Sequence, residues 1–193
     1  MDTTLFYKHF LDYVDFPEED FKEFLKLLVP FILKKNEVFY RMGEIPRYSP
    51  FILKGCVRQY ITTEKGEEQN ILFVEEGTWS GQIGSMRNKV PTNVTMQALE
   101  DCEILGMTID NADYAMEKFP AYGKYFIKKY PADHAKLLEQ SNRLKTETPE
   151  ALYMELLKER PSLILRVPQH HIANYLGVRT ETISRIRNKI AKG

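Results

Sequence analysis

Apolar residues recur every three or four positions at the start of the chain and again beyond residue 109, whereas the stretch between follows a shorter period. The helical spacing over 5–14 and 21–28 predicts two amino-terminal helices. From about 29 to 108, short β-prone runs alternate with glycine-containing turns, which favours a small sandwich or roll. The predicted strands are 37–40, 48–53, 56–62, 70–74, 93–99 and 103–108.

A helical pattern returns at 110–113 and leads into a seam of residues that alternate by three and four positions, as in a heptad repeat. Pro131 lies within this seam and is expected to kink the helix or to mark the start of its continuous part. Because the seam has no partner helix in its own chain, it predicts a homodimer; packing of this face on the β domain is the alternative. The predicted dimer seam comprises Ile127, Tyr130, His134, Leu137, Ser141 and Leu144.

The last part of the chain, 168–190, predicts a helix-turn-helix. Pro168 suits the first turn of the first helix, and Gly177 permits the left-handed backbone at which that helix ends. Thr180 is expected to cap the second helix, whose apolar residues recur on one face. The opposite face is polar, and its candidates for contacts with base edges are Thr180, Glu181, Ser184, Arg185 and Asn188.

The charge of this end of the chain favours binding to phosphate groups. Residues 151–193 contain eight Lys and Arg against three acids, a net charge of +5, although the whole chain balances 27 basic against 27 acidic residues. A basic end on an acidic body weighs against an ordinary helical hairpin with a solvated polar face and favours a module that meets nucleic acid. The candidates for phosphate contacts are Gln169, His170, Arg179, Thr182, Arg187, Lys189 and Lys192.

The segment that joins the seam to the helix-turn-helix predicts one further helix and a strand. Thr148 is expected to cap this helix, with Pro149 in its first turn. A short strand is predicted over 163–167, which makes the module a winged one. The predicted organisation is a β-roll effector domain over 1–115, a dimerisation helix over 116–146 and a winged helix-turn-helix over 147–193.

Composition excludes several other classes of protein. The chain starts without a basic segment and apolar run, and no apolar stretch could span a bilayer, so a cytoplasmic location without membrane contact is expected. Two distant cysteines provide neither a disulfide framework nor the four thiolates of an iron–sulfur cluster. A metal enzyme on a cupin-like barrel needs histidines on its strands, but none lies between Val29 and Thr108, so neither a metal site nor an enzyme is expected.

The roll, the seam helix and the terminal helix-turn-helix together resemble the cyclic-AMP receptor protein / fumarate-nitrate regulator (Crp/Fnr) family of bacterial transcription regulators. The most specific segments are 51–58, 97–101 and 167–186. The resemblance implies an α+β fold with an amino-terminal double-stranded β-helix (a jelly roll like that of cyclic-nucleotide-binding domains) and a homodimer on an inverted repeat in double-stranded DNA. It also implies that Arg185 reads guanine, that Glu181 accepts from cytosine or orients Arg185, and that RNA polymerase is a candidate partner.

The candidate effector pocket is where the chain departs from the family. Segments 79–85 and 90–94 are similar in spacing to the family's phosphate-binding cassette, but Gln82 stands where nucleotide binders have Glu, and Thr92 where they have Arg. The hydroxyl of Thr92 cannot replace a guanidinium beside a phosphate group. Arg87 or Lys89, in the intervening loop, could supply the positive charge instead. Cyclic nucleotide is therefore not expected, nor is haem or an iron–sulfur cluster. For an unidentified small effector, the candidate residues are Trp79, Gly81, Gln82, Ile83, Ser85, Thr92 and Asn93.

Two functional alternatives remain at this point. An effector in the roll is expected to act through a hinge over 144–148, but a constitutively active regulator fits the same residues. The second alternative is a ligand-binding or protein-interaction module that has lost DNA binding. That alternative leaves Glu181, Ser184, Arg185 and the basic segment unexplained.

Overall fold

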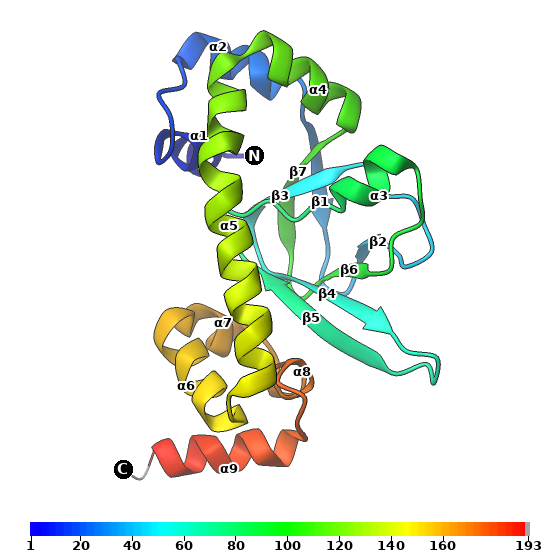
Figure 1. The fold of residues 1–193 in the computed structure, drawn as a ribbon, viewed down its shortest axis with the longest axis vertical. Helices are drawn as coiled ribbons and strands as arrows, with labels where there is room; N and C mark the ends of the chain where they lie inside the picture. The colour runs from blue at the N-terminus through cyan, green and yellow to red at the C-terminus, as the bar shows by residue number, and fades with distance from the viewer. Residues whose placement is uncertain (192–193) are drawn as a thin grey trace.

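The computed structural model describes residues 1–191, which form a roll, a long helix and a carboxy-terminal group of helices (Figure 1). Two amino-terminal helices precede the strands, as predicted: α1 (Thr4–Leu11) and α2 (Glu18–Leu25). The long helix α5 (Pro120–Thr146) runs from the roll to the last group. The last group contains α6 (Pro149–Glu159), α7 (Pro161–Arg166), α8 (Gln169–Tyr175) and α9 (Thr180–Ile190).

The roll consists of two antiparallel sheets, with the strand orders β1-β7-β3 and β2-β6-β4-β5. Side chains from both sheets meet in one buried cluster, in which Ile52, Met96 and Ile104 are fully buried. The strands are β1 (Val29–Leu33), β2 (Val38–Tyr40), β3 (Ser49–Lys54), β4 (Val57–Thr62), β5 (Glu68–Val74), β6 (Thr95–Ala98) and β7 (Cys102–Met107). Helices α3 (Ile83–Asn88) and α4 (Ile109–Lys118) flank the last two strands.

Strand β1 is the element of the roll that the sequence pattern did not predict. Its residues are all apolar, so they lack the alternation that marks a half-buried strand. Pro30 also argues against a strand, but β1 pairs only with β7 and lies at the edge of its sheet, where a missing N–H costs no ladder bond. The other strands fall on the predicted runs.

An aromatic cluster attaches the amino-terminal helices to the roll and to α5. Phe6, Phe10 and Phe24 of α1 and α2 are fully buried together with Tyr125 of α5. The Tyr125 hydroxyl lies 2.6 Å from Nε2 of His9. Burial lowers the pKa of His9 to about 4, so the imidazole is neutral at physiological pH.

The predicted dimer seam lies on the opposite side of α5. Ile127, Tyr130 and Leu137 are 75%, 66% and 53% exposed, so this face does not pack on its own β domain. Leu144 is the exception, because it packs against the apolar core of the carboxy-terminal helices. The helix continues through Pro131. Over residues 1–191, none of the helices combines the length and the apolar character needed to cross a membrane.

The carboxy-terminal helices correct one prediction. Residues 163–167 were expected to form a strand, but α7 covers 161–166, and no strand follows β7 within the described residues, so the predicted wing is wrong there. Pro161 occupies the first turn of α7, and Leu163 and Ile164 are buried while Leu165 is 87% exposed. An apolar run this short does not distinguish a strand from a helix by its period alone.

The predicted helix caps have mixed outcomes. The Thr148 hydroxyl accepts from the backbone N–H of Ala151 at 3.3 Å, which confirms the cap of α6. The cap expected at Thr180 is wrong by one position, because Arg179 occupies the N-cap and Thr180 is the first helical residue. Pro168 likewise immediately precedes the first helical residue of α8.

Candidate nucleic-acid interface

Helices α8 and α9 form the predicted helix-turn-helix. Gly177 has a φ of +68°, a left-handed conformation that glycine adopts without a Cβ clash. The backbone N–H of Val178 donates to the carbonyl of Ala173 at 2.9 Å and closes the turn. Ala173 of α8 and Ile183 of α9 are fully buried. Because the side chain of Ala173 is only a methyl group, the two helices can approach closely. The apolar face of α9 is thereby fixed inward.

The five candidates for base contacts, Thr180, Glu181, Ser184, Arg185 and Asn188, are all exposed on α9. The helix lies across the end of the molecule farthest from α1 and α2, with its outer side uncovered (Figure 1). Neither Glu181 nor Arg185 makes a hydrogen bond or an ion pair with another described residue, so both side chains are available to an external partner. The structure therefore brings all five together on one accessible surface.

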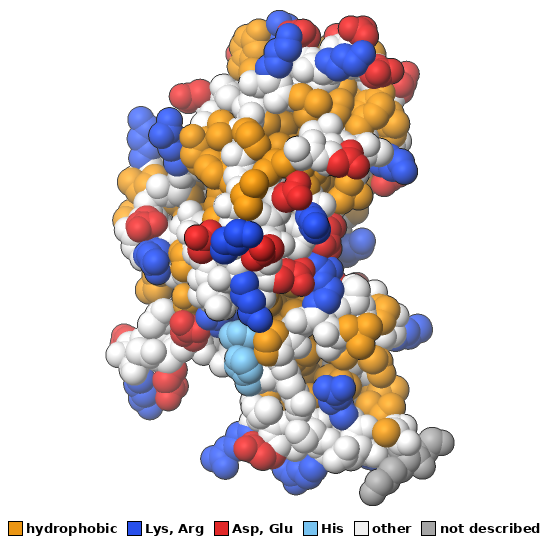
Figure 2. All heavy atoms as spheres, turned by 180° about the vertical axis from the view of Figure 1, so that it is seen from behind, with side chains coloured by type: hydrophobic (Ala, Val, Ile, Leu, Met, Phe, Trp, Pro, Cys, Tyr) orange, Lys and Arg blue, Asp and Glu red, His pale blue; other side chains and the backbone are white. Residues whose placement is uncertain are grey.

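The candidates for phosphate contacts differ in their exposure and in their partners. His170, Arg179 and Arg187 are exposed, and the face drawn in Figure 2 carries Lys and Arg side chains at this end of the molecule. The Nζ of Lys189 lies 2.7 Å from a carboxylate oxygen of Glu150, in a pair that is largely exposed. Gln169 and Thr182 are half-buried, and Lys192 lies outside the described residues.

A first polar cluster joins α8 to the edge of the roll; we call its residues, Arg58, Glu68, Asn70, His171 and Asn174, the hairpin cluster. The side-chain amide of Asn174 accepts from the backbone N–H of Asn70 at 2.6 Å and donates to the carbonyl of Glu68 at 2.8 Å. Since β5 is an edge strand, this amide satisfies backbone groups that a further strand would otherwise pair. The side chain thus docks α8 on the sheet edge.

Arg58 is the centre of the hairpin cluster. Its side chain is 6% exposed and donates to Glu68 Oε2 at 2.5 Å and to Asn70 Oδ1 at 3.1 Å. Its guanidinium also lies 3.4 Å from Nδ1 of His171 and stacks on the ring of Tyr60. A buried arginine needs such a full set of partners, so Arg58 ties the position of α8 to two strands.

A second polar cluster joins α7 to acidic residues of the roll; we call its residues, Glu75, Glu76, Glu100, Arg160, Ser162 and Arg166, the acidic-turn cluster. Arg166 donates to both oxygens of Glu76, at 2.7 and 2.9 Å, and also to Glu100. Arg160 donates to Glu75 at 2.9 Å and to the carbonyl of Phe73 at 2.9 Å. The hydrogen bonds that Arg166 donates to Glu76 and Glu100 raise the pKa of its guanidinium. Two cations of the basic end are therefore paired with acidic residues of the roll.

Neither cluster was predicted from the sequence. The polar residues of the roll were assigned to turns or to strand surfaces, and those of α7 and α8 to the charge of the DNA module. The one available signal was Arg58 itself, a charged residue within an apolar strand run, which is rarely buried unless it is paired. Its partners are 10 to 113 residues away along the chain.

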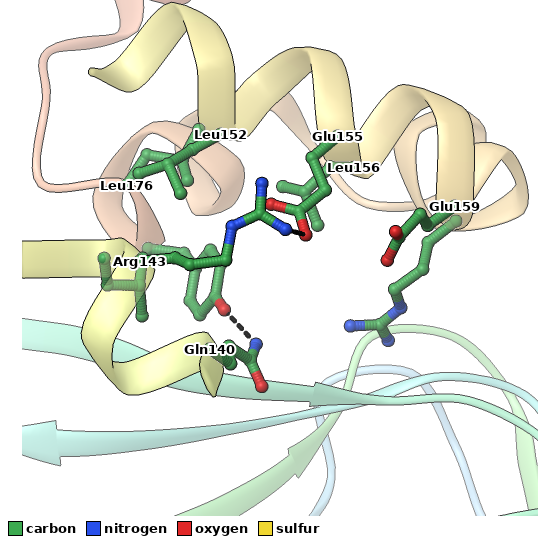
Figure 3. A pocket seen from close by; sticks show the side chains of 10 residues that line it. Gln140, Arg143, Leu152, Glu155, Leu156, Glu159 and Leu176 are labelled. Atoms are coloured by element: carbon green, nitrogen blue, oxygen red, sulfur yellow. Dashed lines mark hydrogen bonds and ion pairs between the residues drawn. The ribbon is translucent and has the colours of Figure 1, made fainter. Parts of the chain in front are cut away.

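The hinge expected over 144–148 is braced by Arg143 (Figure 3). Its guanidinium donates to Glu147 Oε1 at 2.8 Å and also reaches Glu155 on α6. Gln140 donates to the hydroxyl of Tyr175 on α8. A cavity of about 60 Å³ at the junction of α5, α6 and α8 is lined by side chains that include Gln140, Arg143, Glu155 and Tyr175. The end of the long helix is thus bonded to both neighbouring helices.

Acid is expected to weaken the hairpin cluster. Burial first, and then the positive charge of Arg58, lower the pKa of His171 from 6.5 to about 4. Between these values the unfolded chain binds a proton at this residue that the folded chain does not, so the free energy of unfolding falls as the pH decreases from 6.5 to 4. The variant His171→Gln removes this titration and should show a shallower fall in urea melts across that interval. Equal slopes for the two proteins would contradict this assignment.

The candidate effector residues lie in different surroundings. Trp79 packs on Phe6 and Phe51 in the aromatic cluster, and Gly81 lies against Ser49, where an added Cβ would come within 2.1 Å of the hydroxyl. Ser85 is half-buried, whereas Ile83 and Asn93 are exposed. Thr92 is buried, and the half-buried Gln82 donates to the buried Gln59 at 3.4 Å.

A polar network that the sequence did not predict occupies the interior beside Gln82. The amide of Gln59 donates to the hydroxyl of Tyr40 and to that of Ser80, both at 2.8 Å, and all three residues are buried. Burial raises the pKa of Tyr40, so its hydroxyl stays protonated. These neutral groups satisfy one another without a charged partner.

The residues present do not fit a cyclic nucleotide. The hydroxyl of Thr92, at the position of the family's arginine, is buried and accepts from the backbone N–H of Val94 at 3.2 Å. Arg87, the alternative cation, is held by both oxygens of Asp113 at 2.6 and 3.1 Å. An anionic phosphate here would lack the bidentate guanidinium partner that such a group requires.

Both cysteines are buried in the roll. Burial raises the pKa of Cys56 to about 12 and that of Cys102 to about 11, so both remain protonated thiols near neutral pH. Over residues 1–191, no group of three or more His, Cys, Asp or Glu side chains is arranged to hold a metal ion.

Comparison with protein families and curated proteins identifies relatives of this chain. A family profile described as cyclic nucleotide-binding domain matches residues 31–118. The chain is 25% identical over 172 residues to the anaerobic regulatory protein of Haemophilus influenzae, a match that covers 83% of this chain and 66% of that protein. It is also 25% identical over 166 residues to the transcriptional activator protein Anr of Pseudomonas aeruginosa, covering 80% of this chain and 67% of that one. The chain thus spans about two thirds of the length of these relatives.

Solved structures share the fold. FixK2 of Bradyrhizobium japonicum has a TM-score of 0.67 at 21% identity, covering 86% of this chain and 85% of that one. A mutant of CooA from Carboxydothermus hydrogenoformans has a TM-score of 0.66 at 24% identity, covering 87% and 78%. The roll, the long helix and the terminal helix-turn-helix follow one another here as the sequence resemblance predicted. Residues 31–118 thus match the cyclic nucleotide-binding domain, and the chain is similar in sequence and in fold to regulators of the cyclic-AMP receptor protein / fumarate-nitrate regulator family.

Proposed function

We propose that the protein is a sequence-specific DNA-binding transcription regulator. Two of its relatives are named an anaerobic regulatory protein and a transcriptional activator protein. The observation that carries this proposal is the exposed polar face of α9, whose apolar face is buried against α8. A helix that presents hydrogen-bonding side chains on an otherwise uncovered surface, flanked by cations, suits the major groove.

The regulator acts as a homodimer through α5. Two chains paired along the dimer seam present two copies of α9 separated by about one turn of DNA, ~34 Å, so the operator is an inverted repeat. Exposure of Ile127, Tyr130 and Leu137 supports this pairing, since isolated proteins rarely leave such a row of large apolar residues in water.

Within each half-site, Arg185 donates to a guanine, and Glu181 accepts from a cytosine or orients Arg185. Arg179, Arg187, His170 and the other predicted cations bind phosphate, and these contacts set affinity and its salt dependence without reading sequence. The protein acts in the cytoplasm, with RNA polymerase as a further partner. An unidentified small effector in the roll, if one is used, changes the module's position through the hinge and the two polar clusters.

Selection from a randomised DNA pool tests the proposal. The wild-type protein is expected to enrich an inverted repeat, and Arg185→Ala should relax the preference at one position per half-site by about 1–3 kcal/mol. An unchanged profile for Arg185→Ala would remove that residue from base reading. If the wild-type protein selects no sequence, the chain is a ligand-binding or protein-interaction module instead.

A further inference from the structure

Gln169, at the start of α8, reaches across to the first turn of α9. Its Nε2 lies 3.1 Å from the backbone carbonyl oxygen of Thr180 and 2.7 Å from Oγ of Ser184. Thr180 and Ser184 both lie on the exposed face that the proposed function assigns to DNA. The side chain of Gln169 therefore holds the part of α9 that enters the groove.

The direction of these hydrogen bonds follows from the partners. A carbonyl oxygen only accepts, so the amide atom that faces Thr180 is the NH2 group, and this fixes the orientation of the Gln169 side chain. The same NH2 group cannot accept from Ser184. The serine hydroxyl consequently accepts from Gln169, and its own O–H remains free for another partner.

No local acceptor uses that O–H. A serine inside a helix commonly donates to the carbonyl four residues earlier, which for Ser184 is that of Thr180. This oxygen already accepts the helical N–H of Ser184 and the amide of Gln169, which together occupy both of its lone pairs. The Ser184 O–H is thus available to a partner on the exposed surface that Ser184 shares with Glu181 and Arg185.

We infer that Gln169 is a positioning residue that makes Ser184 a hydrogen-bond donor toward DNA, an inference that rests on the proposed function. As a donor, Ser184 recognises an acceptor on a base edge: O4 of thymine, O6 or N7 of guanine, or N7 of adenine. The amino group of cytosine is disfavoured at that position, because Gln169 already occupies one of the two lone pairs of the hydroxyl. Both amide hydrogens of Gln169 are engaged in this arrangement, so its role is to orient Ser184 and not to bind phosphate.

Base-preference profiles over a randomised half-site test this role. The wild-type protein is expected to disfavour cytosine at one position by about five- to tenfold, the worth of one hydrogen bond. Ser184→Ala should abolish that discrimination, and Gln169→Ala should reduce it at least threefold. In Gln169→Glu the carboxylate accepts the Ser184 O–H, so the hydroxyl presents lone pairs to DNA and the preference should move toward cytosine or adenine, which offer amino groups.

The matched control is His170→Ala, which alters an exposed neighbour assigned to phosphate. It should lower affinity for all sequences alike and leave the profile unchanged. Circular dichroism verifies that each variant is folded. If the Gln169 variants retain the wild-type profile, or only bind all sequences equally more weakly, this inference is wrong and the proposed function is unaffected. A wild-type protein that shows no selective binding would overturn the proposed function together with it.

Discussion

Replacing both Ile127 and Leu137 by glutamate is expected to convert the protein to a monomer and to lower its affinity for an inverted-repeat operator about 10²- to 10⁴-fold. Both side chains are largely exposed on the dimer seam, at 75% and 53%. In the dimer, each substitution would bring a carboxylate into an apolar interface and close to its counterpart from the partner chain. A monomer binds only one half-site. It therefore loses the affinity that a dimer gains when its second subunit binds the adjacent half-site of the same operator.

Light scattering and titration of a labelled operator at one fixed salt concentration measure the two effects separately. The matched control is Ile45→Glu, because Ile45 is a 50% exposed apolar residue of the roll outside the seam. The control should remain dimeric and bind normally. A double variant that stays dimeric would place the interface elsewhere, and a monomer that binds as tightly as the wild type would contradict the two-half-site arrangement.

The variant Phe10→Ala is expected to lower the free energy of unfolding by about 3–5 kcal/mol. The ring is fully buried, with its centroid 5.1 Å from that of Phe6 and 4.4 Å from that of Tyr125. The surrounding rings belong to α1, α2 and α5 and are fixed by their own contacts. They cannot close the cavity, so the loss includes both transfer and cavity contributions.

Urea unfolding followed by circular dichroism measures this change. Leu11→Ala is the matched control, because Leu11 follows Phe10 in the same helix but is 44% exposed; its effect should stay below about 1 kcal/mol. Similar losses for the two variants would show that the helix and not the aromatic cluster sets the stability. A loss below about 1 kcal/mol for Phe10→Ala would mean that α1 does not belong to the cooperative core.

The sequence by itself determined the elements whose signal is local. Short β-prone runs between glycine-containing turns predicted the strands, the three-and-four spacing predicted the exposed apolar seam of α5, and Gly177 marked the turn of the helix-turn-helix. The cap at Thr148 was equally predictable, since a hydroxyl that bonds three residues ahead needs only its own neighbours. The exposed face of α9 follows from the same short-range periodicity.

Tertiary structure alone decided the rest. Residues 161–166 form a helix, which a short apolar run does not distinguish from a strand, and the partners of Arg160 and Arg166 are Glu75, Glu76 and Glu100, all more than 60 residues distant. The edge position of β1 makes Pro30 acceptable, and the sheet edge at β5 gives Asn174 its partners. In each case the free energy comes from groups that the chain brings together only on folding, so no window of neighbouring residues contains the information.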